Sequence, residues 1–243
     1  MKKSNRKYNG KLNRVIILVG GSLVICSSAF AQSSFEGFYG HVGIGYGITK
    51  PTDSKGSGTF QFGGQGPSYP FSYVTKDSTS KTPLGVVGVG YYATVRDNFV
   101  LGIGAEFVDN KRKWTNDLTT NNFGVTQAGK YEIVHSYNIF LSPAYAIDKD
   151  KLIYGKFGYM SSDTKVFEPG SDDPIDVNKG YSLGLGYKQI ITGGWYGFVE
   201  GNYFVTKNQS YSNSGTINGN KYSSTSTADS KSYQILTGVG YQF

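Results

Sequence analysis

The chain has 243 residues, a length that suits a single domain, and its formal net charge is +7. Six of its 24 basic residues lie within the first 14 positions, so the remaining 18 stand against 17 acidic residues and leave a net charge of about +1. This near-neutral balance excludes the nucleic-acid binding that a pI of about 9.2 would suggest. The 34 glycines, 20 tyrosines and 15 phenylalanines are typical of a glycine- and aromatic-rich β-sheet.

The amino terminus has the three parts of a secretory signal peptide. Its basic residues precede an apolar run from Val15 to Cys26, and the small-x-small sequence Ala29-Phe30-Ala31 follows that run. The run is too short for a transmembrane helix. We therefore predict a cleaved signal peptide over residues 1–31 and one domain over residues 32–243.

The single cysteine of the chain, Cys26, lies inside the predicted signal peptide. The mature chain would then contain no thiol, which excludes disulfide bonds and thiolate metal sites. Lipid attachment at Cys26 is the alternative, but Ile25 before it is too large for the usual lipoprotein motif. The sequence after Cys26 contains no run of 18 apolar residues that would form a spanning helix.

Eight segments of the predicted mature chain alternate in character with a period of two, which predicts β-strands. In chain order they lie at about 36–50, 84–95, 99–107, 130–147, 153–159, 181–188, 195–205 and 231–243. The connections between them alternate in length. Long polar loops are predicted at 51–82, 110–129, 167–178 and 207–230, and tight turns at 96–98, 148–151 and 192–194. This alternation is expected when one rim of a membrane barrel faces the exterior and the other faces the periplasm.

The two faces of these predicted strands differ in the residues that they carry. The more apolar face has no Asp, Glu, Lys or Arg over the eight alternating segments. A Lys or Arg facing lipid at the middle of a bilayer costs about 2–4 kcal/mol, so this absence indicates contact with hydrocarbon. The opposite face is mostly Gly, Ser and Asn, which predicts the narrow lumen of an eight-stranded barrel.

The last strand carries a terminal aromatic pattern. Val239, Tyr241 and the carboxy-terminal Phe243 fall on its apolar face. This pattern resembles the carboxy-terminal signature of bacterial outer-membrane β-barrels, in which the assembly machinery recognises the final strand. The resemblance predicts that Val239, Tyr241 and Phe243 form the assembly signal.

The whole predicted mature chain resembles the eight-stranded outer-membrane barrels of the OmpA and OmpX type, including the opacity-protein and porin-like small barrels. The predicted fold class is all-β: an eight-stranded antiparallel up-and-down transmembrane barrel after a cleavable signal peptide. The resemblance implies the outer membrane of a Gram-negative bacterium, with outer-membrane lipid, lipopolysaccharide and the barrel assembly machinery as partners. The chain lacks the periplasmic peptidoglycan-binding domain of OmpA itself, so a cell-wall tethering role does not carry over.

Few charged residues fall on the predicted inward face, and we expect those that do to form a polar cluster in the lumen: Lys156, Lys188, Glu200, Glu106 and His41. Lys188 and Glu200 are equally distant from the turn near Gly194, which predicts that they face each other across one hairpin. Buried charges need partners. The cluster is therefore interpreted as a plug that keeps the barrel shut, with a gate or small-ion path as the alternative.

The sequence offers little for catalysis. Two histidines remain in the predicted mature chain, His41 and His135. His41 points inward with no inward acid placed to orient it, and His135 and Ser136 point to opposite faces of one strand. A His-Ser nucleophilic pair needs both groups on one surface. We therefore predict no enzyme activity, no catalytic or metal-binding residues and no cofactor; lipid A modification is the least favoured alternative.

The predicted loops carry whatever binding specificity the barrel has. The first contains five aromatic residues, Phe60, Phe62, Tyr69, Phe71 and Tyr73, which form either a contact surface or packing onto the rim. The third contains the acidic residues Glu168, Asp172, Asp173 and Asp176 without the spacing of known Ca²⁺ loops. The predicted function is structural or surface-interacting, with an extracellular ligand bound through the loops. The alternative is a passive pore or transporter for small or apolar molecules.

Overall fold

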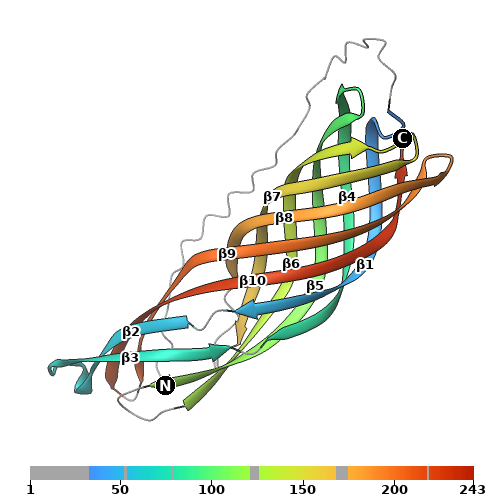
Figure 1. Ribbon diagram of the computed structural model, residues 1–243. Helices are drawn as coiled ribbons and strands as arrows, with labels where there is room; N and C mark the ends of the chain where they lie inside the picture. Colours follow the sequence, from blue (N-terminus) through green and yellow to red (C-terminus); the bar gives the residue numbers. More distant parts are fainter. Residues whose placement is uncertain (1–32, 52–53, 78, 121–125, 168–174, 218) are drawn as a thin grey trace. The chain divides into compact units, whose positions relative to one another are not determined.

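The computed structural model describes residues 33–51, 54–77, 79–120, 126–167, 175–217 and 219–243. The predicted signal peptide lies outside these described residues. The described chain is almost entirely β-structure (Figure 1). The strands are β1 Gly37–Pro51, β2 Ser54–Gln61, β3 Ser68–Asp77, β4 Ser80–Arg96, β5 Phe99–Thr120, β6 Thr126–Ala146, β7 Lys151–Phe167, β8 Ile175–Thr192, β9 Trp195–Ile217 and β10 Asn220–Gln242, with a short 3₁₀ turn, η1 Phe62–Gly64.

Eight of these strands close into a ring of antiparallel neighbours. β1 pairs with β4, each strand from β4 to β10 pairs with the next, and β10 pairs back with β1. Followed around the ring, the register that starts at Lys50 returns to β1 at Gly40, ten residues away. A shear of this size in eight strands corresponds to a tilt of about 40°, within the range of natural barrels. The predicted eight-stranded barrel is confirmed.

The predicted long loops at 51–82, 110–129 and 207–230 are wrong as loops, because most of their residues lie in strands, whereas most of the loop predicted at 167–178 lies outside the described residues. β2 and β3 form a hairpin within the range 51–82; β2 pairs with β10, and β3 pairs with β5. β9 and β10 likewise remain paired as far as Ile217 and Asn220. Figure 1 shows β2 and β3 beyond the end of the ring opposite the carboxy terminus. We call this extended end the outer end and the other the turn end.

The tight turns lie where they were predicted. Asp97 has a φ of 44° in the first, and Gly193 and Gly194 have φ values of 51° and 87° in the third. In the second turn Lys151 Nζ lies 2.9 Å from Asp148 Oδ2. This hydrogen bond from Lys151 lowers the pKa of Asp148 below its ordinary value. The positive φ values of Asp97, Gly193 and Gly194 are what two-residue hairpin turns require.

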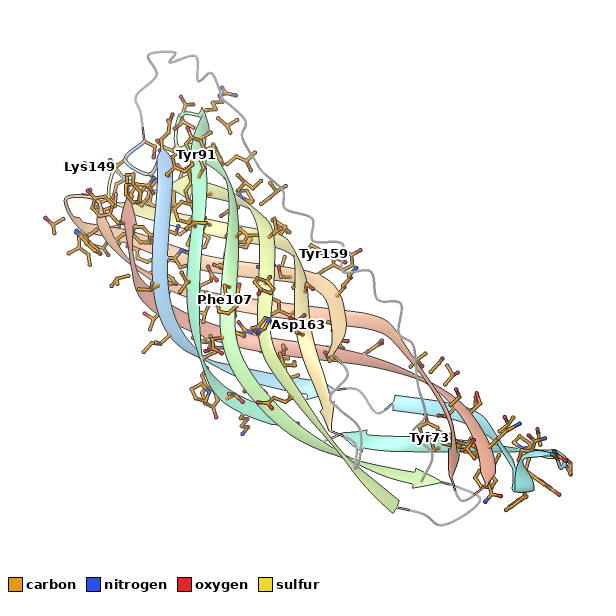
Figure 2. The ribbon with its side chains drawn as sticks, turned by 180° about the vertical axis from the view of Figure 1, so that it is seen from behind. Tyr73, Tyr91, Phe107, Lys149, Tyr159 and Asp163 are labelled. Carbon is orange, nitrogen blue, oxygen red and sulfur yellow. The ribbon has the colours of Figure 1, made fainter. Side chains whose placement is uncertain are left out.

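The barrel exterior carries two rings of aromatic side chains with aliphatic residues between them. The ring nearer the outer end consists of Tyr46, Phe107, Tyr137, Tyr159, Tyr181, Tyr203 and Tyr233, and the ring nearer the turn end of Phe38, Tyr91, Phe99, Tyr145, Tyr187, Trp195, Tyr241 and Phe243. Figure 2 shows Tyr91 near the turn end and Phe107 and Tyr159 farther along the wall. The eight residue steps from Tyr233 to Tyr241 place the rings about 20 Å apart along the axis.

Outward positions between these rings hold no Asp, Glu, Lys or Arg in the eight barrel strands. Instead they expose aliphatic side chains such as Ile44 and Leu185, which are 71% and 72% exposed. A soluble protein rarely leaves so large a continuous apolar surface uncovered. The belt between aromatic girdles is therefore the surface that meets membrane hydrocarbon. Among the described residues, no helix is long and apolar enough to span a membrane.

The lumen is filled with large side chains, so the prediction of a mostly Gly, Ser and Asn interior is wrong. Buried aromatic rings point inward from several strands: Tyr39, Tyr92, Phe140, Tyr154, Tyr196, Phe198 and Phe204. The inward glycines provide the space that these rings occupy. A Cβ on Gly186 would lie 2.3 Å from the Tyr154 ring, and a Cβ on Gly240 would lie 2.3 Å from the Tyr196 ring. Glycine and aromatic residues thus alternate across neighbouring strands to fill the core.

Candidate functional site: a charged cluster in the lumen

The centre of the lumen holds a buried ion pair network around Lys156 on β7. Its Nζ lies 2.5 Å from Glu106 Oε1 on β5 and 2.9 Å from Glu200 Oε1 on β9. The side chains of all three residues are at most 3% exposed. One ammonium therefore bridges two carboxylates across the lumen, and the network ties together β5, β7 and β9. Charge-assisted hydrogen bonds of this kind are stronger than neutral ones.

The two carboxylates have further partners, so that neither relies on Lys156 alone. Tyr154 donates a hydrogen bond of 2.8 Å to Glu200 Oε2, and Asn202 Nδ2 donates one of 2.6 Å to Glu200 Oε1. His41 Nε2 lies 3.2 Å from Glu106 Oε1. The prediction that no inward acid orients His41 is therefore wrong. Glu106 and His41 are separated by 65 residues in sequence, and two successive strand pairings bring them together, because His41 is opposite Gly88 on β4 and Gly88 is opposite Glu106 on β5.

Lys188 on β8 is buried but lies outside this ion pair network. Its Nζ lies 3.8 Å from the centroid of the Tyr39 ring, and 4.9–5.1 Å from three other tyrosine rings: Tyr92, Tyr154 and Tyr196. Four tyrosines from β1, β4, β7 and β9 thus surround one lysine. A cation is attracted to the faces of aromatic rings, more strongly where water is absent. We refer to these residues as the tyrosine cage.

The predicted cross-strand pair of Lys188 and Glu200 is wrong. Lys188 is opposite Phe198, and Glu200 is opposite Gly186. A register shift between Ile190 and Thr192 moves the pairing relative to a regular hairpin. One extra residue in one strand of a hairpin is enough to displace every later pair.

The tyrosine cage was only partly visible in the sequence. In the alternation of the predicted strands, Tyr39 shares the inward face with His41, and Tyr92 shares it with Gly88 and Gly90. Tyr154 and Tyr196 are not among the lumen residues predicted from the sequence. The glycines at the matching positions of the neighbouring strands are the signal that would have identified them, since Gly186 lies against Tyr154 and Gly240 against Tyr196. An inward glycine beside an inward tyrosine indicates a ring lying across the neighbouring strand.

The network and the tyrosine cage leave very little free space between them. All of their side chains except that of Tyr196, together with Phe140 and Phe198, line a cavity of about 10 Å³, which is about the space that one water molecule needs. His41 Nδ1 is buried without a hydrogen-bond partner. The described residues contain no group of three or more His, Cys, Asp or Glu side chains that could hold a metal ion. Chemically, the cluster can hold charges in place and exclude water.

The second histidine lies on the exterior, at the outer margin of the apolar belt. His135 Nε2 on β6 is 2.7 Å from Asp163 Oδ2 on β7, and Asp109 on β5 is opposite His135. Figure 2 shows Asp163 on the wall beyond Phe107 and Tyr159. In the described part of the chain, neither histidine hydrogen-bonds a serine or threonine hydroxyl. A nucleophilic triad needs that contact.

The four acidic residues predicted in the third loop do not form a described site. Glu168, Asp172 and Asp173 lie outside the described residues, and Asp176 lies in β8, opposite Thr164. The aromatic residues of the first loop lie on the β2–β3 hairpin instead. Val239, Tyr241 and Phe243 face outward in or beside the ring of aromatic residues near the turn end.

A closed antiparallel ring with a charge-free apolar belt and a filled lumen defines a transmembrane β-barrel. No protein-family model matches the chain, and its sequence matches no curated protein. Its fold does match solved structures of bacterial outer-membrane proteins. OprG from Pseudomonas aeruginosa is 14% identical, and the match covers 87% of this chain and 99% of that one with a TM-score of 0.50.

Two further solved structures match with lower TM-scores. The attachment invasion locus protein Ail of Yersinia pestis is 12% identical, with 85% of this chain and 99% of that chain covered and a TM-score of 0.39. The outer membrane protease OmpT from Escherichia coli is 10% identical, with 88% and 99% covered and a TM-score of 0.43. The likeness concerns the fold. The chain has the fold of an eight-stranded outer-membrane β-barrel.

Proposed function

We propose that this barrel is a closed, non-enzymatic outer-membrane protein with a structural and surface-interaction role, and that its binding function belongs to the outer end. The observation that supports this proposal is the filled lumen. A network that satisfies Lys156, Glu106 and Glu200, and a tyrosine cage that surrounds Lys188, leave a cavity of about 10 Å³ in the middle of the barrel. A continuous aqueous path would have to displace several of these side chains.

Electrostatics support a permanent plug over a gate. Removing one partner from a buried ion pair leaves an uncompensated charge that costs about 3–5 kcal/mol. Opening the lumen by moving Lys156 would leave both Glu106 and Glu200 without that partner. The network is also anchored on three strands, so no single loop or turn can carry it aside. We therefore interpret the network as a fixed cross-brace.

The β2–β3 tip at the outer end is arranged in a way that suits binding. Phe62 and Tyr69 at the β2–β3 tip are 52% and 47% exposed and stack edge to face with centroids 5.6 Å apart. The tip is held by two hydrogen bonds, from Gln61 Nε2 to Gly66 O at 2.6 Å and from Gly63 N to Asn220 Oδ1 at 2.9 Å. Because these rings are exposed, we interpret them as a contact surface and not as packing onto the rim. The hydrogen bonds already hold the tip in place, so binding a partner would cost little conformational entropy.

The test of this function is a planar-bilayer recording of the refolded full chain. We expect no steady single-channel conductance, because the lumen network excludes a water path. Overexpression in cells should leave the mass spectrum of lipid A unchanged, since neither histidine has a hydroxyl nucleophile among the described residues. A steady current in the wild type would reject the plug, and a shifted lipid A mass would reject the non-enzymatic assignment.

One observation favours the alternative of a passive transporter for small or apolar molecules. β5 pairs with β4 as far as Asp109 and with β3 only from Asn116, so the intervening residues have no partner on that side among the described residues. This break in strand pairing lies at the outer margin of the belt. An apolar molecule in the barrel would pass through the wall into the membrane at such a break. Quenching of Trp fluorescence by an added alkane or aromatic compound, with saturation, would favour this alternative.

The carboxy-terminal strand is proposed as the signal for the assembly machinery. Phe243 is 77% exposed, and its ring centroid lies 5.0 Å from that of Tyr241. We expect Phe243→Ser to reduce strongly the amount of folded barrel in the outer membrane of expressing cells, without preventing refolding into detergent micelles. The matched control is Phe38→Ser, which removes an exposed ring near the same end from β1. Equal losses for the two variants in cells would contradict a specific signal.

A further inference from the structure

Three lysines lie close together on the exterior, just beyond the outer aromatic ring. Lys50 is near the end of β1 and Lys231 lies directly opposite it on β10. Lys81 on β4 is opposite Ile48, which puts it diagonally across from Lys50 on the same face. All three side chains are exposed. We call Lys50, Lys81 and Lys231 the outer lysine patch.

Three lysines this close together repel one another unless an anion binds between them. Directly opposed residues on one face have Cβ atoms about 4.5–5.5 Å apart, and like charges in these positions destabilise a sheet. In the described part of the chain, none of the three lysines makes an ion pair. The three strands together span about 10 Å. The patch therefore has the charge and width to bind a group with more than one negative charge.

The surroundings of the patch indicate where this anion resides. Below it, toward the turn end, the same three strands expose apolar side chains, including Tyr46 and Ile44 on β1 and Ile235 on β10. These belong to the belt that meets hydrocarbon. A molecule whose chains lie on this belt would place its headgroup at the lysines. A soluble anion would gain nothing from the belt.

The opposite wall of the barrel has the reverse charge at a similar height. Asp109 on β5, His135 on β6 and Asp163 on β7 form an outward row across three neighbouring strands. This row disfavours anionic headgroups, while β4, β1 and β10 favour them. Among the described residues of these two sectors, the outward charges thus differ in sign, which points to the lysine patch as the sector that attracts anions.

From these observations we propose that the outer lysine patch binds the multiply phosphorylated headgroup of a lipid in the outer leaflet, with the acyl chains lying on the belt below it. The inference deepens the structural role proposed above by naming a lipid partner. It does not depend on the state of the lumen, so its failure would leave the conductance test unaffected.

The test is a lipid titration of the full chain in detergent micelles, followed by native mass spectrometry. The probe is lipid A with two phosphates, and the variant is Lys50→Gln/Lys81→Gln/Lys231→Gln. Each lysine near an anionic headgroup contributes roughly a fivefold change in affinity, so the triple variant should bind about 100-fold more weakly. The matched control changes three exposed lysines elsewhere, Lys55→Gln/Lys149→Gln/Lys221→Gln, and should bind as the wild type does.

Three further titrations distinguish a multiply phosphorylated lipid from other anions. Dephosphorylated lipid A, the singly charged phosphatidylglycerol and inorganic phosphate should each bind at least tenfold more weakly to the wild type. Equal binding of lipid A by the two triple variants would overturn the patch as the site. Phosphatidylglycerol binding as tightly as lipid A would overturn the multiply charged headgroup, and tight binding of inorganic phosphate would overturn the lipid. Heat-modifiable gel migration of each variant verifies that the barrel has folded.

Discussion

Lys156→Met is expected to lower the free energy of unfolding by about 3–5 kcal/mol. The substitution removes the ammonium that lies 2.5 Å from Glu106 and 2.9 Å from Glu200, and leaves two carboxylates facing each other in the lumen. Their remaining partners are neutral groups and His41, which cannot balance two negative charges. The measurement is urea unfolding of the full chain refolded into lipid vesicles, followed by tryptophan fluorescence.

Lys188→Met is the matched control, because Lys188 is as deeply buried as Lys156 but its ammonium lies among tyrosine rings. Here the substitution removes a cation that makes no ion pair with either carboxylate of the network, so stability should stay within about 1.5 kcal/mol of the wild type. The triple change Lys156→Met/Glu106→Gln/Glu200→Gln should recover much of the loss. Equal losses for the two single variants would show that the network does not brace the barrel.

Gly238→Val is expected to lower the free energy of unfolding by about 3 kcal/mol, near the upper end for overpacked sites. A Cβ at this position would lie 2.2 Å from Val42 O and 2.6 Å from Gly43 Cα, both of which belong to the β1 backbone. Backbone cannot rotate away as a side chain can. The β1–β10 contact that closes the ring would therefore have to separate, which heat-modifiable migration and urea unfolding would both detect.

Gly201→Val provides the control on the lipid-facing side of β9. No atom lies within 4 Å of a Cβ at Gly201, and the residue is exposed. The added methyl groups would face hydrocarbon, so the change in stability should be within about 0.5 kcal/mol. If the two valine variants unfolded at the same urea concentration, the close approach of β1 and β10 would not limit what position 238 accepts.

Lys156 and Gly238 contribute to the stability of the barrel in different ways. The lumen network uses charge to hold β5, β7 and β9 at fixed distances, while the inward glycines allow large rings and neighbouring backbone to approach closely. In the proposed function, both leave the narrow barrel without a path for water. This is why the proposed function places recognition on the surface, at the β2–β3 tip and the outer lysine patch.

The strand positions and the side that faces lipid could be predicted because both depend on local alternation. Residues such as Ile139 and Leu141 alternate with Asn138 and Phe140, and a period of two needs no knowledge of the neighbouring strands. The outer extensions were missed because Ser-, Thr- and Asn-rich segments have no apolar periodicity. They form strands because pairing partners continue beside them, as Thr225 does beside Ser212 and Ser57.

By itself the sequence determined the class of fold, the order of the barrel strands and the lipid-facing surface, because membrane hydrocarbon forbids charge at every second residue. Only the tertiary structure decided which lumen charges meet. The two-residue turn and the register shift between Ile190 and Thr192 together place Lys188 opposite Phe198 rather than Glu200. The pairings of β1 with β4 and of β4 with β5 bring His41 to Glu106. Contacts of this kind depend on the register of each strand against its neighbours, and that register is a property of the paired strands rather than of any single segment.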